Sequence, residues 1–276
     1  MQNSSPNFSD LFPGEDYRLQ LRFQRGGVAE FFGPTERHAA LISQRRHWLQ
    51  HAPRTYAALW PEGIPLLDET IGLARDWPTN APADVLKLES PWQRCLALGE
   101  MLEPDFLLLK PQDDGRFQLL GGCVCFPSSW SLAEKMGRPL DFIHSVVPGL
   151  NAQLGNQIHG FLSKLKPGLA WQRTNWGLSR STELNQHPER ALPRLGAAVT
   201  LAEVWLRVEQ QALVALPQTQ GILFGIRIAN HALTDFKKDP TATDRLIRAL
   251  QTMPDEMAHY KNLATARANL IALLQS

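Results

Sequence analysis

Two neighbouring runs of alternating residues, 204–216 and 221–228, constrain the fold of this chain most strongly. In the first run Val and Leu residues alternate with Trp, Arg, Glu and Gln, and the second run continues the same period of two. The short segment 217–220, Pro-Gln-Thr-Gln, separates the two runs. A period of two places successive side chains on opposite faces of a strand. The two runs therefore predict adjacent antiparallel strands with one apolar face.

The rest of the chain changes repeatedly between helical and extended patterns. Apolar spacing, Ser or Thr caps and Gly or Pro stops predict helices at 35–51, 66–75, 90–103, 131–137, 150–165, 243–251 and 255–274. Strand-forming runs predict strands at 17–23, 106–109, 117–126 and 171–178, the middle two joined in a hairpin by an Asp-Gly turn. This order, without internal repeats, predicts an α+β fold with an antiparallel sheet rather than a doubly wound one.

The balance of charge argues against nucleic-acid binding. The 276 residues include 28 Lys and Arg against 27 Asp and Glu, a formal net charge of +1. A surface that neutralises phosphates needs an excess of cations. Hydrophobic residues make up 43% of the chain, no apolar run approaches the length of a membrane span, and no secretory signal opens it. With only three cysteines, the expectation is a folded cytoplasmic protein without a disulfide framework.

Familiar cofactor motifs are missing from the sequence. It has no glycine-rich dinucleotide fingerprint, no phosphate-binding loop with its Lys, and no nucleophile elbow. Cys123 and Cys125 share one strand face, but zinc sites usually separate paired cysteines by two or more residues. We expect them to be small buried hydrophobic residues, with a metal or redox role as the alternative.

His144 differs from the other histidines in its setting. It lies within Phe-Ile-His-Ser-Val-Val-Pro, residues 142–148, where the ring is poorly solvated and needs a partner. One interpretation is a core histidine that is hydrogen-bonded to a carbonyl. The other is a ligand for a metal or for haem iron, because imidazole suits an axial position.

A polar face on the strand 204–216 is the second candidate site. Alternation places Trp205, Arg207, Glu209 and Gln211 on one side. This pattern fits a solvated sheet face with cross-strand ion pairs. It also fits a ligand pocket in which Arg binds an anion and Glu binds a cation or moves a proton. A similar mixture stands on the preceding predicted strand, in Arg173, Asn175 and Trp176.

Four segments, in order and spacing, resemble the haem-dependent oxidative N-demethylase family. Residues 143–149, Ile-His-Ser-Val-Val-Pro-Gly, resemble its Ile-His-x-Pro-Val-Pro-Gly signature. Residues 130–137 fit its Trp and Glu-Lys-x-Gly segment, and 173–176 match its Arg-x-Asn-Trp element. Residues 206–213, Leu-Arg-Val-Glu-Gln-Gln-Ala-Leu, are similar to its Leu-Arg-x-Glu-Arg-Gln-x-Leu strand.

The resemblance implies a PAS-like sheet that holds haem b and removes a methyl group oxidatively from a small secondary amine. Such a subunit uses O2 and electrons from a flavin or iron–sulfur reductase partner. The implied domains are an N-terminal arm and helical extension at 1–89, a PAS-like haem-binding core at 90–232, and C-terminal helices at 233–276. A haem-binding PAS-like sensor or carrier without turnover is the alternative.

By position, the resemblance makes His144 the axial haem ligand. Arg207 would bind a propionate or oxygen, and Glu209 an alkylammonium substrate. The remaining pocket residues would be Arg173, Asn175 and Trp176. Two positions depart from the pattern: Val146 replaces the first Pro of the signature, and Gln210 replaces an Arg. The lost Pro is expected to loosen the backbone after His144, because Pro fixes φ.

Overall fold

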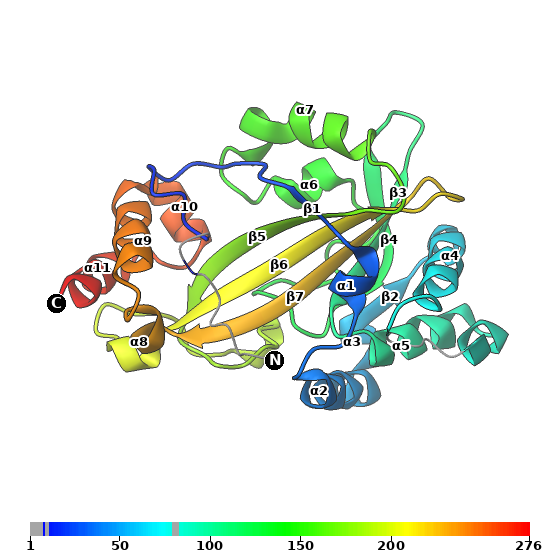
Figure 1. The fold of residues 1–276 in the computed structure, drawn as a ribbon, viewed down its shortest axis with the longest axis horizontal. Coiled ribbons are helices and arrows are strands. Elements are labelled where there is room, and N and C mark those ends of the chain that lie inside the picture. The colour runs from blue at the N-terminus through cyan, green and yellow to red at the C-terminus, as the bar shows by residue number, and fades with distance from the viewer. Residues whose placement is uncertain (1–7, 9–10, 79–82) are drawn as a thin grey trace.

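One seven-stranded antiparallel sheet organises the computed structural model, which describes residues 8, 11–78 and 83–276 (Figure 1). The strand order is β1-β5-β6-β7-β3-β4-β2. The strands are Gln24–Gly26 (β1), Ala57–Leu59 (β2), Asp105–Pro111 (β3), Phe117–Cys123 (β4), Ala170–Ser179 (β5), Trp205–Ala215 (β6) and Ile222–Ala232 (β7). Both edge strands are three residues long and come from the N-terminal part of the chain, and β1 pairs with only the first three residues of β5.

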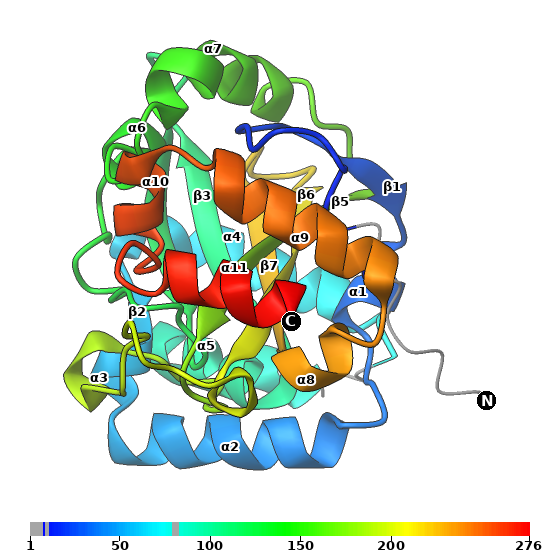
Figure 2. The same cartoon turned by 90° about the vertical axis from the view of Figure 1, so that its left-hand side faces the viewer.

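Helices flank the sheet and cover its ends. They are Val28–Phe32 (α1), His38–His51 (α2), Pro53–Tyr56 (α3), Ile64–Ala74 (α4), Pro91–Met101 (α5), Leu140–His144 (α6), Leu150–Leu162 (α7), Leu233–Phe236 (α8), Pro240–Thr252 (α9), Asp255–Tyr260 (α10) and Arg267–Gln275 (α11). Figure 2 shows α9, α10 and α11 across one end of the sheet, with α7 above and α2 below. Over the described ranges, no helix has both the length and the apolar character needed to cross a membrane.

The register of the long strands decides which side chains share a face. Asn175 on β5 lies opposite Glu209 on β6, and Gly177 lies opposite Arg207. Opposed residues of an antiparallel pair point to the same face. Arg173, opposite Gln211, therefore joins the same polar face, whereas intervening residues of β5 and β6 point to the other side of the sheet.

The long strands and the Ser90 cap agree with the sequence patterns, and the predicted α+β fold is confirmed, but the helix expected from Thr35 begins only at His38, with Arg37 as its N-cap. The hairpin of β3 and β4 turns through Asp114 and Gly115 as expected. Ser90 caps α5 by accepting from the Gln93 N–H at 3.4 Å. The pair β6 and β7 forms the longest ladder, in register from Trp205 to Ala215.

The single helix predicted over 255–274 is wrong, because it divides into α10 and α11. Asn262 adopts a left-handed φ of 56°. Its N–H donates to the His259 carbonyl at 3.0 Å, and the Leu263 N–H donates to the Ala258 carbonyl at 2.8 Å. These two bonds form a Schellman motif, in which a left-handed residue satisfies the last carbonyls of a helix.

Two shorter predictions also fail. Residues 131–137 form turns rather than a helix, because the Gly137 N–H donates to the Leu119 carbonyl at 2.7 Å and so ties the segment to β4. Gly137 has a φ of 71°, and a Cβ there would lie 2.0 Å from the Trp60 ring. Residues 17–23 have no regular secondary structure, and strand pairing begins only at Gln24.

Candidate functional site

A cavity of about 1230 Å³ lies among the sheet, α6, α7, the N-terminal arm and the C-terminal helices. Its volume exceeds the range of about 300–1,000 Å³ typical of small-molecule sites, and it is divided between the two faces of β5. The wall formed by α6 and α7 is apolar and includes Leu140, Leu150, Leu154, Ile158, Phe161 and Leu162. The wall formed by the sheet is polar and includes Arg173, Asn175 and Gln211.

His144 ends α6 and lines this cavity. Its ring makes no hydrogen bond to any residue within the described ranges, so the interpretation as a carbonyl-bonded core histidine finds no partner. Burial lowers the pKa of His144 from 6.5 to about 4, and the charge of Arg173 acts in the same direction. At neutral pH the ring is therefore uncharged, and it keeps a nitrogen lone pair that can be donated to a metal ion.

Two cations line the cavity: Arg173 on the polar wall, and Lys261 beside Trp176 at the edge of β5. Burial lowers the pKa of Arg173, and its guanidinium forms no hydrogen bond or ion pair with another described residue. Lys261, which follows α10, donates from Nζ to the Trp176 carbonyl at 2.7 Å. Burial lowers the pKa of Lys261 to about 8. Partly buried cations without a carboxylate in contact favour the binding of an anion.

Glu209 is held in one orientation by neutral donors. Its two carboxylate oxygens accept from Ser128 Oγ, from Asn175 Nδ2 at 3.2 Å and from Gln211 Nε2 at 3.0 Å. No cation in the described part of the chain lies within ion-pair distance of it. Asn175 and Gln211 both line the cavity, whereas Glu209, to which they donate, is not among the lining residues. A fixed carboxylate of this kind can accept a further hydrogen bond from an ammonium group.

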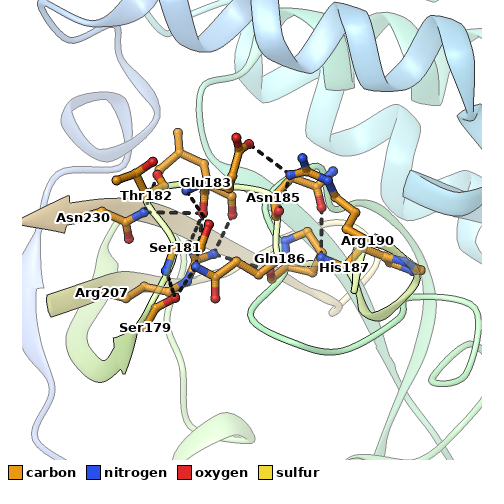
Figure 3. Close-up of polar contacts among 12 residues, drawn as sticks. Ser179, Ser181, Thr182, Glu183, Asn185, Gln186, His187, Arg190, Arg207 and Asn230 are labelled. Atoms are coloured by element: carbon orange, nitrogen blue, oxygen red, sulfur yellow. Dashed lines mark hydrogen bonds and ion pairs between the residues drawn. The ribbon is translucent and has the colours of Figure 1, made fainter. Parts of the chain in front are cut away.

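Arg207 lies next to Glu209 on the same face, but its N–H groups donate to backbone carbonyls and to a hydroxyl of neighbouring loops. Nη2 donates to the carbonyls of Phe126 and Leu184, at 2.9 and 2.8 Å, and Nε donates to Ser128 Oγ at 2.8 Å. Figure 3 shows Arg207 beneath the loop that carries Glu183. The residue is only 3% exposed and does not line the cavity. Arg207 therefore fixes the loops beside Glu209, and its guanidinium has no donor directed to the cavity.

Trp176 points to the opposite face of the sheet from Arg173 and Asn175, because it pairs with Val208. Its ring packs edge-on against Phe12, with centroids 4.9 Å apart, and Lys261 Nζ lies 4.9 Å from the ring centroid. It still lines the cavity, which reaches both sides of the β5 edge. The structure thus brings His144, Arg173 and Asn175 to one lobe, and Trp176 to another.

The two departures from the family pattern lie away from this polar wall. Gln210 pairs with Thr174 and Arg227, so its side chain is on the face opposite Glu209. Val146 is 57% exposed in the turn that follows α6. Neither change removes a charge from the face shared by Arg173 and Glu209.

The cysteines lie in a separate buried cluster. Cys123 Sγ is 3.8 Å from Cys125 Sγ and accepts from Arg45 Nη2 at 3.4 Å. Arg45 also forms a buried ion pair with Asp105. Within the described ranges, no group of three or more His, Cys, Asp or Glu side chains is arranged to hold a metal ion. The cysteines are buried as expected from the sequence.

The sequence patterns did not identify Lys261, Tyr17 or Phe23 as cavity residues. The only local signal near Lys261 is the next residue, Asn262. Asn can adopt the left-handed conformation that ends a helix, so it could have indicated that the helix stops before this point. Tyr17 and Phe23 carry no motif. Their place at the cavity depends on how the N-terminal arm crosses the finished fold.

One protein-family model matches most of the chain, including the majority of the strands and helices that form the cavity. A family model described as haem-dependent oxidative N-demethylase, alpha subunit-like, matches residues 36–271. The match includes α6 with His144, the strands β5 and β6, and the helix that precedes Lys261. It extends well beyond the four segments that carried the resemblance. The chain therefore belongs to the haem-dependent oxidative N-demethylase, alpha subunit-like family.

Proposed function

We propose that this chain binds haem b through His144 and demethylates a small secondary amine oxidatively, with O2 and with electrons from a partner reductase. The observation that carries the proposal is the neutral, unbonded His144 ring on a cavity larger than a small substrate needs. A ring without a protein partner, facing such a cavity, suits an axial ligand of haem iron.

The charges of the cavity also fit this cofactor. Haem b carries two propionates, and two partly buried cations, Arg173 and Lys261, line the cavity without a carboxylate in contact among the described residues. We propose that they bind the propionates. The apolar wall of α6 and α7 suits the flat, largely apolar porphyrin. When bound, haem supplies the oxygen chemistry, and the protein supplies orientation and electrostatics.

The residues around Glu209 suit the recognition of an amine. We propose that its carboxylate accepts a hydrogen bond from the substrate ammonium and fixes the N-methyl group by orientation and charge. Asn175 and Gln211 hold the carboxylate from one side, and Ser128 holds it from the other. Arg207 positions Ser128 and so acts on Glu209 indirectly.

Electron supply is assigned to a partner because the sequence has no fingerprint for a flavin or a nicotinamide cofactor. A flavin or iron–sulfur reductase is the proposed class. A cytoplasmic location and a haem-binding core at 90–232, with extensions at 1–89 and 233–276, belong to the same proposal. The alternative function, a haem-binding sensor or carrier, shares the cofactor but has no turnover.

The test is haem titration of the purified protein, followed by its Soret absorption. Wild type is expected to bind one haem per chain, His144→Ala to lose or shift the Soret band, and His47→Ala, an exposed histidine on α2, to behave as wild type. Absence of haem binding by wild type would refute the proposal. The haem-loaded protein is then incubated with dimethylamine, O2 and a chemical reductant, and released formaldehyde is measured. An enzyme is expected to release formaldehyde, and a sensor or carrier is not.

A further inference from the structure

An unpaired segment of the N-terminal arm, residues 17–23, borders the cavity. Figure 1 shows the arm running from the C-terminal helices, alongside α7, to β1. The segment has no regular secondary structure, and among the described residues the backbone of 18–23 makes no hydrogen bond to the rest of the protein. Its side chains nevertheless line the cavity, those of Tyr17, Leu19, Leu21 and Phe23 included.

The segment is fixed at its two ends. At the first end the Tyr17 N–H donates to Thr252 Oγ1 on α9 at 2.8 Å, and Asp16 pairs with Arg248 at 3.1 Å. At the other end Gln24 begins the pairing of β1 with β5. Between these points only side-chain contacts hold the segment. Regions with few backbone hydrogen bonds open at low free-energy cost while the rest of the fold stays closed.

Phe23 makes the contact that closes the segment onto the cavity walls. Its ring stacks on Phe161 of α7, with centroids 4.5 Å apart and planes 14° from parallel. Phe161 in turn packs edge-on against Trp171 of β5 at 5.4 Å. The Arg173 guanidinium lies 5.9 Å from the Phe23 ring centroid. Phe23 therefore joins the apolar wall of α7 to the polar wall at Arg173.

The segment lies outside the range that the family model matches, which begins at residue 36. The cavity thus has a wall that the matched part of the chain does not supply. A wall with fixed ends, and with a middle held only by side-chain packing of Leu19, Leu21 and Phe23, is suited to open and close over a bound molecule.

We propose that residues 17–23 form a clasp that retains the cofactor, with Phe23 as the residue that holds the clasp closed against Phe161. This inference rests on the proposed function, because it takes haem as the molecule retained. The clasp slows the departure of haem without ligating its iron. Loss of the Phe23 ring therefore increases the dissociation rate and leaves the His144 ligation intact.

The test measures the transfer of haem from loaded protein to excess apomyoglobin. Phe23→Ala is expected to lose haem at least about ten-fold faster than wild type, with Phe23→Leu in between and the Soret maximum unchanged. A ten-fold change corresponds to about 1.4 kcal/mol. Arg46→Ala is the control, because Arg46 is exposed on α2 and does not line the cavity, and its rate is expected to equal that of wild type.

A second measurement needs no variant and stays decisive if Phe23→Ala fails to fold. Arg18 and Arg22 are exposed within the clasp, so trypsin can cut there when the clasp opens. Haem loading of wild type is expected to slow cleavage after these two residues at least several-fold, as read by mass spectrometry. Equal cleavage with and without haem, or a wild-type rate of haem loss in Phe23→Ala, overturns the clasp. Failure of wild type to bind any haem refutes the proposed function instead.

Discussion

Nε2 of His159 on α7 lies 2.6 Å from Oδ1 of Asp141 on α6. Asn151, also on α7, donates from Nδ2 to the Asp141 carbonyl at 2.7 Å. Asp141 precedes His144 by one turn of the same five-residue helix. Because so short a helix has little stability of its own, these contacts to α7 set its orientation. The two contacts thereby position the His144 ring.

His159→Leu is expected to weaken haem binding more than it weakens the fold. It removes one hydrogen bond, a loss of about 1 kcal/mol, but it also removes Nδ1, which is buried without a partner in the described chain. Denaturant unfolding of the haem-free protein should therefore change by no more than about 1 kcal/mol. Haem titration should give a several-fold higher dissociation constant. Asn156→Ala, exposed on the same helix, is the control; equal haem affinity in both variants would contradict the positioning role.

Arg207 and Arg173 lie on one sheet face, but replacement by Met is expected to change the stability of the haem-free protein in opposite directions. It should lower stability at Arg207 and preserve or raise it at Arg173. Arg207→Met leaves the buried carbonyls of Phe126 and Leu184 without their donor, at about 1–3 kcal/mol for each unsatisfied group. Arg173→Met removes a cation that has no hydrogen-bonded partner among described residues, so the haem-free protein should keep or gain stability.

Chemical unfolding and haem titration of both variants check this contrast. Arg207→Met should unfold at clearly lower denaturant, whereas Arg173→Met should lose haem affinity at least about ten-fold. Arg180→Met, which breaks only an exposed ion pair with Glu203, controls for the loss of charge. A strongly destabilised Arg173→Met with normal haem affinity would reverse the roles assigned to the two arginines.

The sequence was informative where a pattern is local. Period-two alternation located β6 and β7, and the Ser90-Pro91 cap located the start of α5. It placed Arg207 and Glu209 on one face correctly, but it could not distinguish their environments. What separates them is the pair of loops that supplies carbonyls to Arg207 and a hydroxyl to Glu209. Those loops are distant in sequence, and their approach depends on tertiary packing.

The failures have the same physical origin. The helix pattern over 255–274 was continuous in apolar spacing, but the chain leaves the helix from residue 261 to 266, around the left-handed Asn262. Gly137 is drawn into contact with β4 and Trp60, which prevents the helix expected at 131–137. Phe23 lies at the cavity because β1 pairs with β5, a contact between residues nearly 150 positions apart. No local pattern encodes such contacts.

Glu209→Gln is expected to weaken amine binding and to leave haem binding unchanged. Glutamine keeps the size of the side chain but removes the negative charge that an ammonium group needs. Dimethylamine titration of the loaded protein, followed by the haem spectrum, should give at least about a ten-fold higher dissociation constant. Glu189→Gln, which removes an exposed carboxylate outside the cavity, is the control and should bind dimethylamine as wild type does. Loss of haem in Glu209→Gln would assign the residue to cofactor binding instead.

Lys261 should make stability depend on pH in the alkaline range. Its pKa is lowered by burial to about 8, below the ordinary 10.5, so between these values the unfolded chain binds more protons than the folded one. Stability then rises with pH through this window, by about 1.4 kcal/mol per pH unit for one full proton. Below pH 8 both states are protonated, and the cost of burying the charge is fully present. Lys261→Met lacks this gain, so the unfolding free energy of wild type minus that of Lys261→Met should increase from pH 8 to 10.

The measurement is urea unfolding of the haem-free proteins at pH 7, 8, 9 and 10. Comparison with the variant at each pH cancels the titration of the other lysines and tyrosines. Lys237→Met is the matched control for the lost hydrogen bond, because Lys237 Nζ also donates to a backbone carbonyl, that of Leu273, at 3.0 Å. A difference between wild type and Lys261→Met that stays constant across the series would mean that the ammonium group is well solvated. In that case Lys261 would be a poor candidate to bind a propionate. A solvated cation must lose its hydration before it binds the propionate, and that loss costs free energy.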